Sequence, residues 1–166
     1  VLLEGEGIAA FPLDVHMSVL DGSLGILPQR LMVADRDHFR GSAHAVPEIG
    51  ELAGRYGIRT TTANAEAVDG AGIVVIGVKP QDIETLLGDI SGTVTAEQTV
   101  ISIAAAIPTA LIEKHLSDRV PVVRVMPNTP MTVHEGMAGV SAGTYAEEEH
   151  LALAEDSAAR WGGSAW

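Results

Sequence analysis

Residues 122–130, which read Val-Val-Arg-Val-Met-Pro-Asn-Thr-Pro, constrain the fold of this chain more than any other stretch. Their first half is apolar and β-branched, which is typical of a short buried strand. Pro127 ends the strand because it has no N–H to donate, and Pro130 stiffens the turn after it. Asn128 and Thr129 are therefore predicted on a rigid turn at the carboxyl end of a strand, where ligands bind in open parallel α/β sheets. The alternative is an ordinary strand-ending turn, in which Pro, Asn and Thr are common.

Two segments nearer the N-terminus have the same design. Residues 74–81 read Val-Val-Ile-Gly-Val-Lys-Pro-Gln, an apolar strand that ends in Lys-Pro, and residues 100–106 read Val-Ile-Ser-Ile-Ala-Ala-Ala. Strands that alternate with helices predict a doubly wound α/β fold with a mostly parallel, Rossmann-like sheet. The pattern predicts strands over residues 31–34, 58–62, 73–78, 100–105, 122–126 and 137–141, and helices over residues 82–90, 108–116 and 147–161.

Together, the segments VVIGVKPQ, VISIAAAIPTALIE and VVRVMPNTP resemble the pyrroline-5-carboxylate reductase family in sequence, order and spacing. The resemblance extends from about Leu27 to about Gly143, and Val-Lys-Pro-Gln followed by Met-Pro-Asn-Thr-Pro makes it specific. It implies an oxidoreductase that uses NAD(P)H to reduce 1-pyrroline-5-carboxylate to L-proline, a step of proline biosynthesis in the cytoplasm. It further implies NADP as the cofactor, with NAD as the alternative, and a small imino acid as the substrate.

The resemblance also implies where the cofactor lies. It places the backbone of Val78, Lys79 and Pro80 against the ribose and nicotinamide, so Lys79 belongs to a backbone shelf and is not predicted as a catalytic base. The primary amide of Asn128 both donates and accepts, which suits the nicotinamide carboxamide. Ala106 stands where the family usually has glycine, and its Cβ would crowd a left-handed turn. No catalytic proton donor is predicted, and the remaining predicted cofactor contacts are Ala104, Met126, Pro127 and Thr129.

Near the start of the chain, Gly-Glu-Gly-Ile-Ala-Ala fits the dinucleotide motif G-x-G-x-x-A. The small residues Gly5, Gly7 and Ala10 would permit a tight turn and bring a pyrophosphate close to a helix N-terminus. Glu6 opposes this function because it places a carboxylate between the glycines. Pro12 opposes it because it removes a hydrogen bond from the first helix. Gly5, Gly7 and Ala10 are predicted to bind the cofactor, with a spoiled phosphate cradle as the alternative.

Asp35 and Arg36 come directly after the predicted strand over residues 31–34. An acid at this place would bind the ribose hydroxyls of NAD, whereas an arginine would accept the 2′-phosphate of NADP. The resemblance favours NADP with Arg36 as its partner, and a solvated charge pair is the alternative. Asn64 matches an asparagine that lies near the adenosine ribose in the family, and it also suits the N-cap of the next helix.

Composition excludes several kinds of function. The chain has no cysteine, which excludes disulfides, thiolate catalysis and cysteine metal sites. Its net charge of −12 argues against non-specific binding to nucleic acid. No stretch is apolar for long enough to cross a bilayer, and no signal peptide is predicted. His38 and His44 lack a third ligand, so residues 37–48 are predicted to form a loop insertion without a metal.

One NAD(P)-binding domain is predicted over residues 1–145. Leu151, Ala154 and Ala158 come next at helical spacing, and residues 146–166 are predicted to lead towards a C-terminal helical domain. In the family that domain builds the dimer and much of the imino-acid pocket, and it is absent from this sequence. A homo-oligomer is therefore predicted only together with the missing domain.

Two other functions stay open. A module that binds dinucleotide without turnover would agree with the flawed glycine motif and with the missing helical domain. A related two-domain NADP oxidoreductase or a β-hydroxyacid dehydrogenase would share the early strands. The segment Met-Pro-Asn-Thr-Pro favours the pyrroline family over these relatives.

Overall fold

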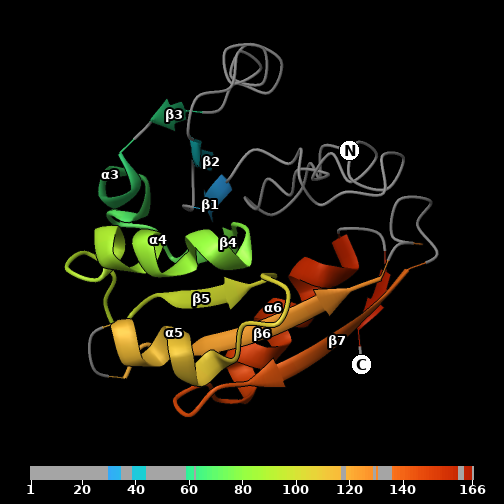
Figure 1. Cartoon of the computed structure of the whole chain (residues 1–166). Coiled ribbons are helices and arrows are strands. Elements are labelled where there is room, and N and C mark those ends of the chain that lie inside the picture. The colour runs from blue at the N-terminus through green and yellow to red at the C-terminus, as the bar shows by residue number, and fades with distance from the viewer. Residues whose placement is uncertain are drawn as a thin grey trace.

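The computed structural model describes residues 30–34, 39–43, 59–61, 63–116, 119–128, 130, 136–160 and 163–165. In this part of the chain an eight-stranded sheet has the order β3-β2-β1-β4-β5-β6-β7-β8 (Figure 1). The strands are β1 (Arg30–Ala34), β2 (Phe39–Ala43), β3 (Arg59–Thr61), β4 (Ile73–Gly77), β5 (Thr99–Ser102), β6 (Val122–Pro127), β7 (Gly136–Ala142) and β8 (Gly163–Ala165). The helices are α3 (Asn64–Val68), η1 (Pro80–Asp82), α4 (Ile83–Ile90), α5 (Thr109–His115) and α6 (Glu148–Arg160).

The centre of the sheet is the parallel trio β4, β5 and β6. Val74 pairs with Val100, and Val100 pairs with Val122, so the three strands are in register and point the same way (Figure 1). The strands are largely apolar, with Arg124 of β6 as an exception, as expected for strands that are covered on both faces. The three predicted strands are confirmed, although β5 ends at Ser102, earlier than predicted, and β6 includes Pro127.

The outer pairings mix both directions. Four of the seven pairings are parallel, and β1–β2, β1–β4 and β6–β7 are antiparallel, so the mostly parallel sheet is confirmed. The predicted strand over residues 31–34 is confirmed as β1, and it runs antiparallel to β4. The predicted loop insertion over residues 37–48 is wrong, because it contains β2. Only four residues separate β1 from β2, too few for the crossover that a parallel pair needs, so the two strands pair antiparallel.

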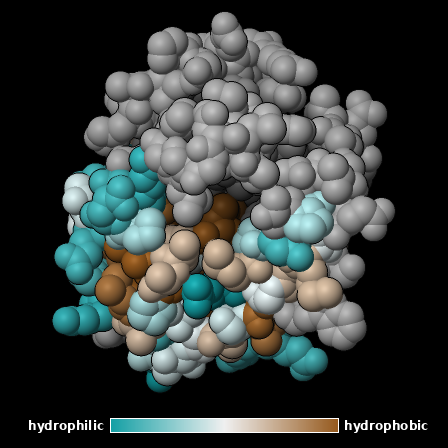
Figure 2. All heavy atoms as spheres, turned by 45° about the vertical axis from the view of Figure 1, so that its right-hand side comes forward, coloured by the Kyte–Doolittle hydropathy of each residue, from teal (hydrophilic) through white to brown (hydrophobic). Residues whose placement is uncertain are grey.

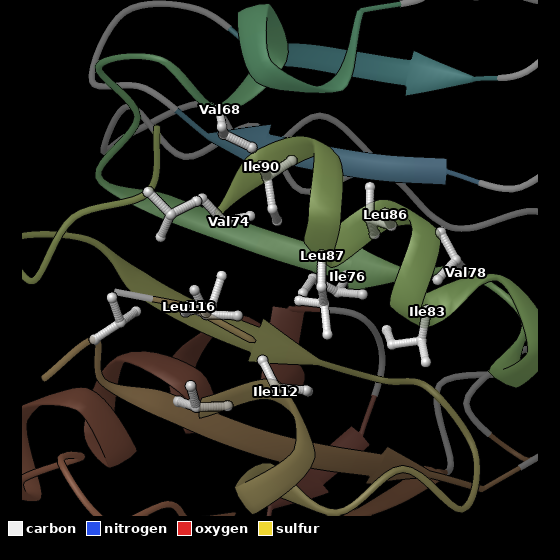
Figure 3. Close-up of a cluster of buried hydrophobic side chains, with 14 of the residues drawn as sticks. Val68, Val74, Ile76, Val78, Ile83, Leu86, Leu87, Ile90, Ile112 and Leu116 are labelled. Atoms are coloured by element: carbon white, nitrogen blue, oxygen red, sulfur yellow. The ribbon is translucent and has the colours of Figure 1, made fainter. Parts of the chain in front are cut away.

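Helices α3, α4 and α5 cover one face of the central strands. In α4 the buried residues Ile83, Leu86, Leu87 and Ile90 have the spacing of a single helix face. They belong to a buried cluster with Ile76 of β4, which Figure 3 shows together with side chains from α3 and α5. Burial of this cluster is the main source of stability on this face.

Helix α6 covers the opposite face, which makes the fold doubly wound. Its Ala154 and Ala158 are fully buried in a second cluster with Ile101 of β5 and Val125 of β6, and the partly buried Leu151 packs against that cluster. The predicted helix over residues 147–161 and its buried positions are confirmed. The domain boundary at residue 145 stays a prediction.

A buried glutamine holds the connection into β5 in place. Gln98 is 5% exposed. Its Oε1 accepts a hydrogen bond from the backbone N–H of Thr95 at 2.8 Å. Its Nε2 donates to the carbonyls of Val68 at 2.8 Å and Ala71 at 2.7 Å. One side chain thereby satisfies three backbone groups and ties the end of α3 to the loop before β5.

None of the helices described is long and apolar enough to pass through a membrane. The described residues also contain no group of three or more histidine, aspartate or glutamate side chains that would hold a metal ion.

Candidate functional site

The carboxyl ends of β4, β5 and β6 meet at one edge of the sheet. Ile76, Ser102 and Arg124 are adjacent in the register of these strands. Two residues further along the chain stand Val78 and Ala104, just beyond the ends of β4 and β5, and Met126 within β6. The structure thus brings together three segments that were each selected separately from the sequence. Figure 2, in which the right-hand side of Figure 1 comes forward, shows apolar and hydrophilic residues intermixed on the coloured part of this face.

The residues predicted to contact the cofactor at this edge differ in how far their side chains are exposed. Val78 and Ala104 are buried in the core beneath α4, and Ala104 is only 2% exposed, so these positions can offer little more than backbone. Lys79 is extended, with φ −66° and ψ 149°, and its carbonyl accepts the N–H of Asp82 at 3.0 Å as η1 begins. Met126 is 42% exposed and presents its thioether at the edge. The geometry agrees with a backbone shelf beside one exposed apolar side chain.

A left-handed turn lies directly after β5. Ala106 has a φ of 59°, the conformation expected from the sequence for the position at which the family usually has glycine. For a residue with a Cβ this conformation costs roughly 1–2 kcal/mol. The loop that follows Ala104 therefore adopts this conformation at a cost in the free energy of folding.

We expect Ala106→Gly to stabilise the chain by about 0.5–1 kcal/mol, because glycine relieves the left-handed strain but loses more entropy on folding. Urea unfolding of both chains measures the difference. Ala105→Gly is the matched control, because Ala105 does not have a positive φ and should lose about 0.5–1 kcal/mol. Destabilisation by both substitutions would contradict a strained turn at Ala106.

Asn128 is exposed, and it is bonded to the neighbouring strand. Its N–H donates to the carbonyl of Met137 at 2.9 Å, and its Oδ1 accepts the N–H of Met137 at 2.8 Å. From the sequence, the amide of Asn128 was expected both to donate to and to accept from a nicotinamide carboxamide. Oδ1 already accepts one backbone bond, and Nδ2 carries the two donors that this side chain can offer to a ligand.

Asn64 does not have the capping role considered for it. The N-cap of α3 is Ala63, and Asn64 is the first residue of the helix, so the N-cap alternative is wrong. Its Nδ2 donates to Oδ2 of Asp89 in α4 at 2.8 Å. That bond joins two helices on one face of the sheet. Its place near an adenosine ribose stays a prediction.

The remaining predicted contacts, Gly5, Gly7, Ala10, Asp35, Arg36 and Thr129, lie outside the described residues. His38 and His44 do so too. The described strand β1 ends with Ala34 beside Ile73, at the edge opposite to Val78. Asp35 and Arg36 therefore come after a strand that does not end at the edge formed by β4, β5 and β6, and their cofactor role stays a prediction.

Arg124 was not among the candidates selected from the sequence. Its Nε is buried and has no hydrogen-bond partner among the described residues, and its Nη2 donates only a weak bond of 3.8 Å to Sδ of Met126. The available signal was a single arginine inside an otherwise apolar strand. Its side chain lies beside Met126, close to the edge at which the predicted contacts gather.

Comparison with known sequences decides the family. The chain is 42% identical over 132 residues to a pyrroline-5-carboxylate reductase of Corynebacterium melassecola, covering 78% of this chain and 46% of the relative. It is 39% identical over 108 residues to the pyrroline-5-carboxylate reductase of Methanosarcina acetivorans, covering 65% of this chain and 40% of the relative. The chain belongs to the pyrroline-5-carboxylate reductase family. It spans less than half the length of these relatives.

Solved structures agree with this family. A pyrroline-5-carboxylate reductase from Coxiella burnetii matches with a TM-score of 0.68 and 30% identity. The match covers 75% of the present chain and 46% of the Coxiella burnetii chain. A Plasmodium falciparum pyrroline carboxylate reductase solved with NADP bound shares the fold, with a TM-score of 0.59 and 23% identity over 66% of this chain and 41% of that one. Residues 1–43, which include Gly5, Gly7 and Ala10, match a family described as "Putative prokaryotic signal transducing protein".

Proposed function

We propose that the edge formed by β4, β5 and β6 holds the nicotinamide end of a dinucleotide, in a protein that reduces 1-pyrroline-5-carboxylate to L-proline. The observation that carries the proposal is that β4, β5 and β6 run parallel and in register to one carboxyl edge, where Val78, Ala104 and Met126 follow the paired residues. Ligands bind at this edge in open α/β sheets. The names of the relatives support pyrroline-5-carboxylate as the substrate. A place in proline biosynthesis, in the cytoplasm, is part of the same proposal.

The residues present fit such a cofactor. The buried Val78 and the extended backbone of Lys79 before Pro80 offer a backbone shelf, and the exposed Met126 offers an apolar, polarisable surface to a flat ring. Nδ2 of Asn128 would add a contact to the carboxamide oxygen that is secondary to the contacts of the backbone. When bound, the reduced nicotinamide supplies a hydride, and the chain orients the ring and keeps water from it. No described residue at this edge is assigned the role of proton donor.

Among nicotinamide cofactors, NADP is proposed, with Arg36 as the partner of the 2′-phosphate and NAD as the alternative. The resemblance of the segment after residues 31–34 supports this choice, and the Plasmodium falciparum relative was solved with NADP. A homo-oligomer is proposed only for a protein that also carries the helical domain implied by the family.

Formation of L-proline tests the reaction. The purified chain is incubated with NADPH and 1-pyrroline-5-carboxylate, and L-proline is detected by chiral chromatography while NADPH absorbance is monitored. The proposal predicts one proline for each NADPH oxidised. Cofactor binding without proline would instead identify a silent dinucleotide-binding module. Absence of both binding and proline would contradict the proposal.

Met126→Glu tests the edge itself. We expect it to weaken NADPH binding at least tenfold, about 1.4 kcal/mol, because it replaces an apolar surface by a hydrated carboxylate. Fluorescence titration with NADPH measures the dissociation constant. Tyr145→Glu is the matched control, because Tyr145 is similarly exposed but comes after β7, which ends at the opposite edge. Equal effects of the two substitutions would argue against binding at Met126.

A further inference from the structure

The β6–β7 ladder ends in an unusual way. Its register pairs Met126 with Gly139 and Pro127 with Ala138, so Asn128 stands opposite Met137. In an antiparallel ladder, a hydrogen-bonded pair exchanges two backbone bonds, each N–H donating to the other residue's carbonyl. Asn128 makes the first bond in the ordinary way, through its N–H to the carbonyl of Met137 at 2.9 Å.

The second bond comes from a side chain. The N–H of Met137 donates to Oδ1 of Asn128 at 2.8 Å, in the position that the backbone carbonyl of Asn128 would occupy in a continuing ladder. The primary amide thus replaces a peptide carbonyl as the acceptor. This replacement satisfies Met137 and allows the backbone to leave the sheet at Asn128.

The neighbouring proline is consistent with this geometry. Bonded pairs and non-bonded pairs alternate along an antiparallel ladder, so the bonded pair at Asn128 puts Pro127 in a non-bonded pair with Ala138. The missing N–H of Pro127 therefore costs no bond to β7. The missing N–H of Pro127 therefore does not end the β6–β7 ladder. The backbone leaves the ladder at Asn128.

We propose that Asn128 is a positioning residue, whose Oδ1 locks the end of β6 to β7 and so fixes the backbone of Met126, Pro127 and Asn128 at the sheet edge. This inference rests on the proposed function, because that backbone is the part of β6 that would face the nicotinamide. The acceptor Oδ1 is the group that matters. The donor Nδ2 is secondary.

Amide hydrogen exchange tests the lock directly. NMR measures the exchange of the Met137 N–H in the unsubstituted chain, in Asn128→Ala and in Asn128→Asp. We expect Asn128→Ala to speed this exchange about tenfold because the acceptor is lost, whereas Asn128→Asp keeps an acceptor oxygen and the protection. Asn64→Ala is the control, since the Asn64 amide bonds Asp89 elsewhere in the fold. Unchanged protection in Asn128→Ala would overturn the proposal.

NADPH affinity separates positioning from direct contact. We expect Asn128→Ala to weaken binding about tenfold, with its midpoint of thermal unfolding little changed, and Asn128→Asp to restore most of the affinity. If Asn128→Asp binds as poorly as Asn128→Ala while protecting Met137, the donor Nδ2 is decisive and the positioning role is wrong. If the unsubstituted chain binds no NADPH, the proposed function fails, while the exchange data still decide whether Asn128 locks the strand.

Discussion

Replacing Gln98 by leucine is expected to lower the free energy of unfolding by about 3 kcal/mol. The substitution keeps an apolar stem in a site that is only 5% exposed, but it removes one hydrogen bond from each of three backbone groups. The carbonyl of Ala71 and the N–H of Thr95 would lose the bonds to Gln98, and the carbonyl of Val68 would keep only its bond from the N–H of Ala71 at 3.2 Å. An unsatisfied buried group costs about 1–3 kcal/mol, and the added apolar contact offsets only part of the sum.

Urea unfolding of the two chains measures this loss. Gln81→Leu is the matched control, because it makes the same chemical change at an exposed position and should alter stability by no more than about 0.5 kcal/mol. If Gln98→Leu were as mild as Gln81→Leu, the three bonds of Gln98 would not join α3 to the loop before β5 in solution.

The second large effect is expected from Ala154→Glu in α6. Ala154 has no exposed surface and packs among Ile101 and Val125 on the sheet. A carboxylate there must either lose its hydration without a cationic partner among the described residues of that cluster or force the helix from the sheet. We expect a loss of about 4 kcal/mol, which is a large part of the stability of a domain of this size.

Ala152→Glu is the control for this substitution. Ala152 lies on the same helix two residues before Ala154, on its exposed side, so the added charge stays hydrated and the change should be within about 0.5 kcal/mol. Unfolding in urea compares the two variants. If both variants were equally stable, α6 would not be packed on the sheet. Residues 146–166 would then act mainly as a linker.

The central strands were predictable because they are covered on both faces. Such strands are largely apolar: β4 is a continuous apolar run, β5 has Val100 and Ile101 at its centre, and β6 is apolar apart from Arg124. The face of α6 was predictable from Ala154 and Ala158, which recur at helical spacing. These features depend only on residues close together in the chain, so the amino-acid sequence alone reveals them.

Features set by non-local pairing were not predictable. β2, Phe-Arg-Gly-Ser-Ala, has one large apolar residue and no clear strand pattern, so its pairing with β1 and β3 decides its conformation. The residues of β1 likewise do not indicate that this strand pairs antiparallel with β4. The bond between Oδ1 of Asn128 and Met137 depends on how β7 returns, nine residues later, and a turn-forming asparagine alone does not reveal it.

The most direct test of the nicotinamide site is an NMR titration of the chain, isotope-labelled at its methionine methyl groups, with NADPH. Met126 is exposed at the edge where β4, β5 and β6 end. We expect the Met126 methyl signal to shift and saturate as NADPH binds, with a weaker response or lower affinity for NADH. A Met126 signal that stays unmoved when NADPH has saturated the chain would contradict the site, and the edge would then have to be assigned another role.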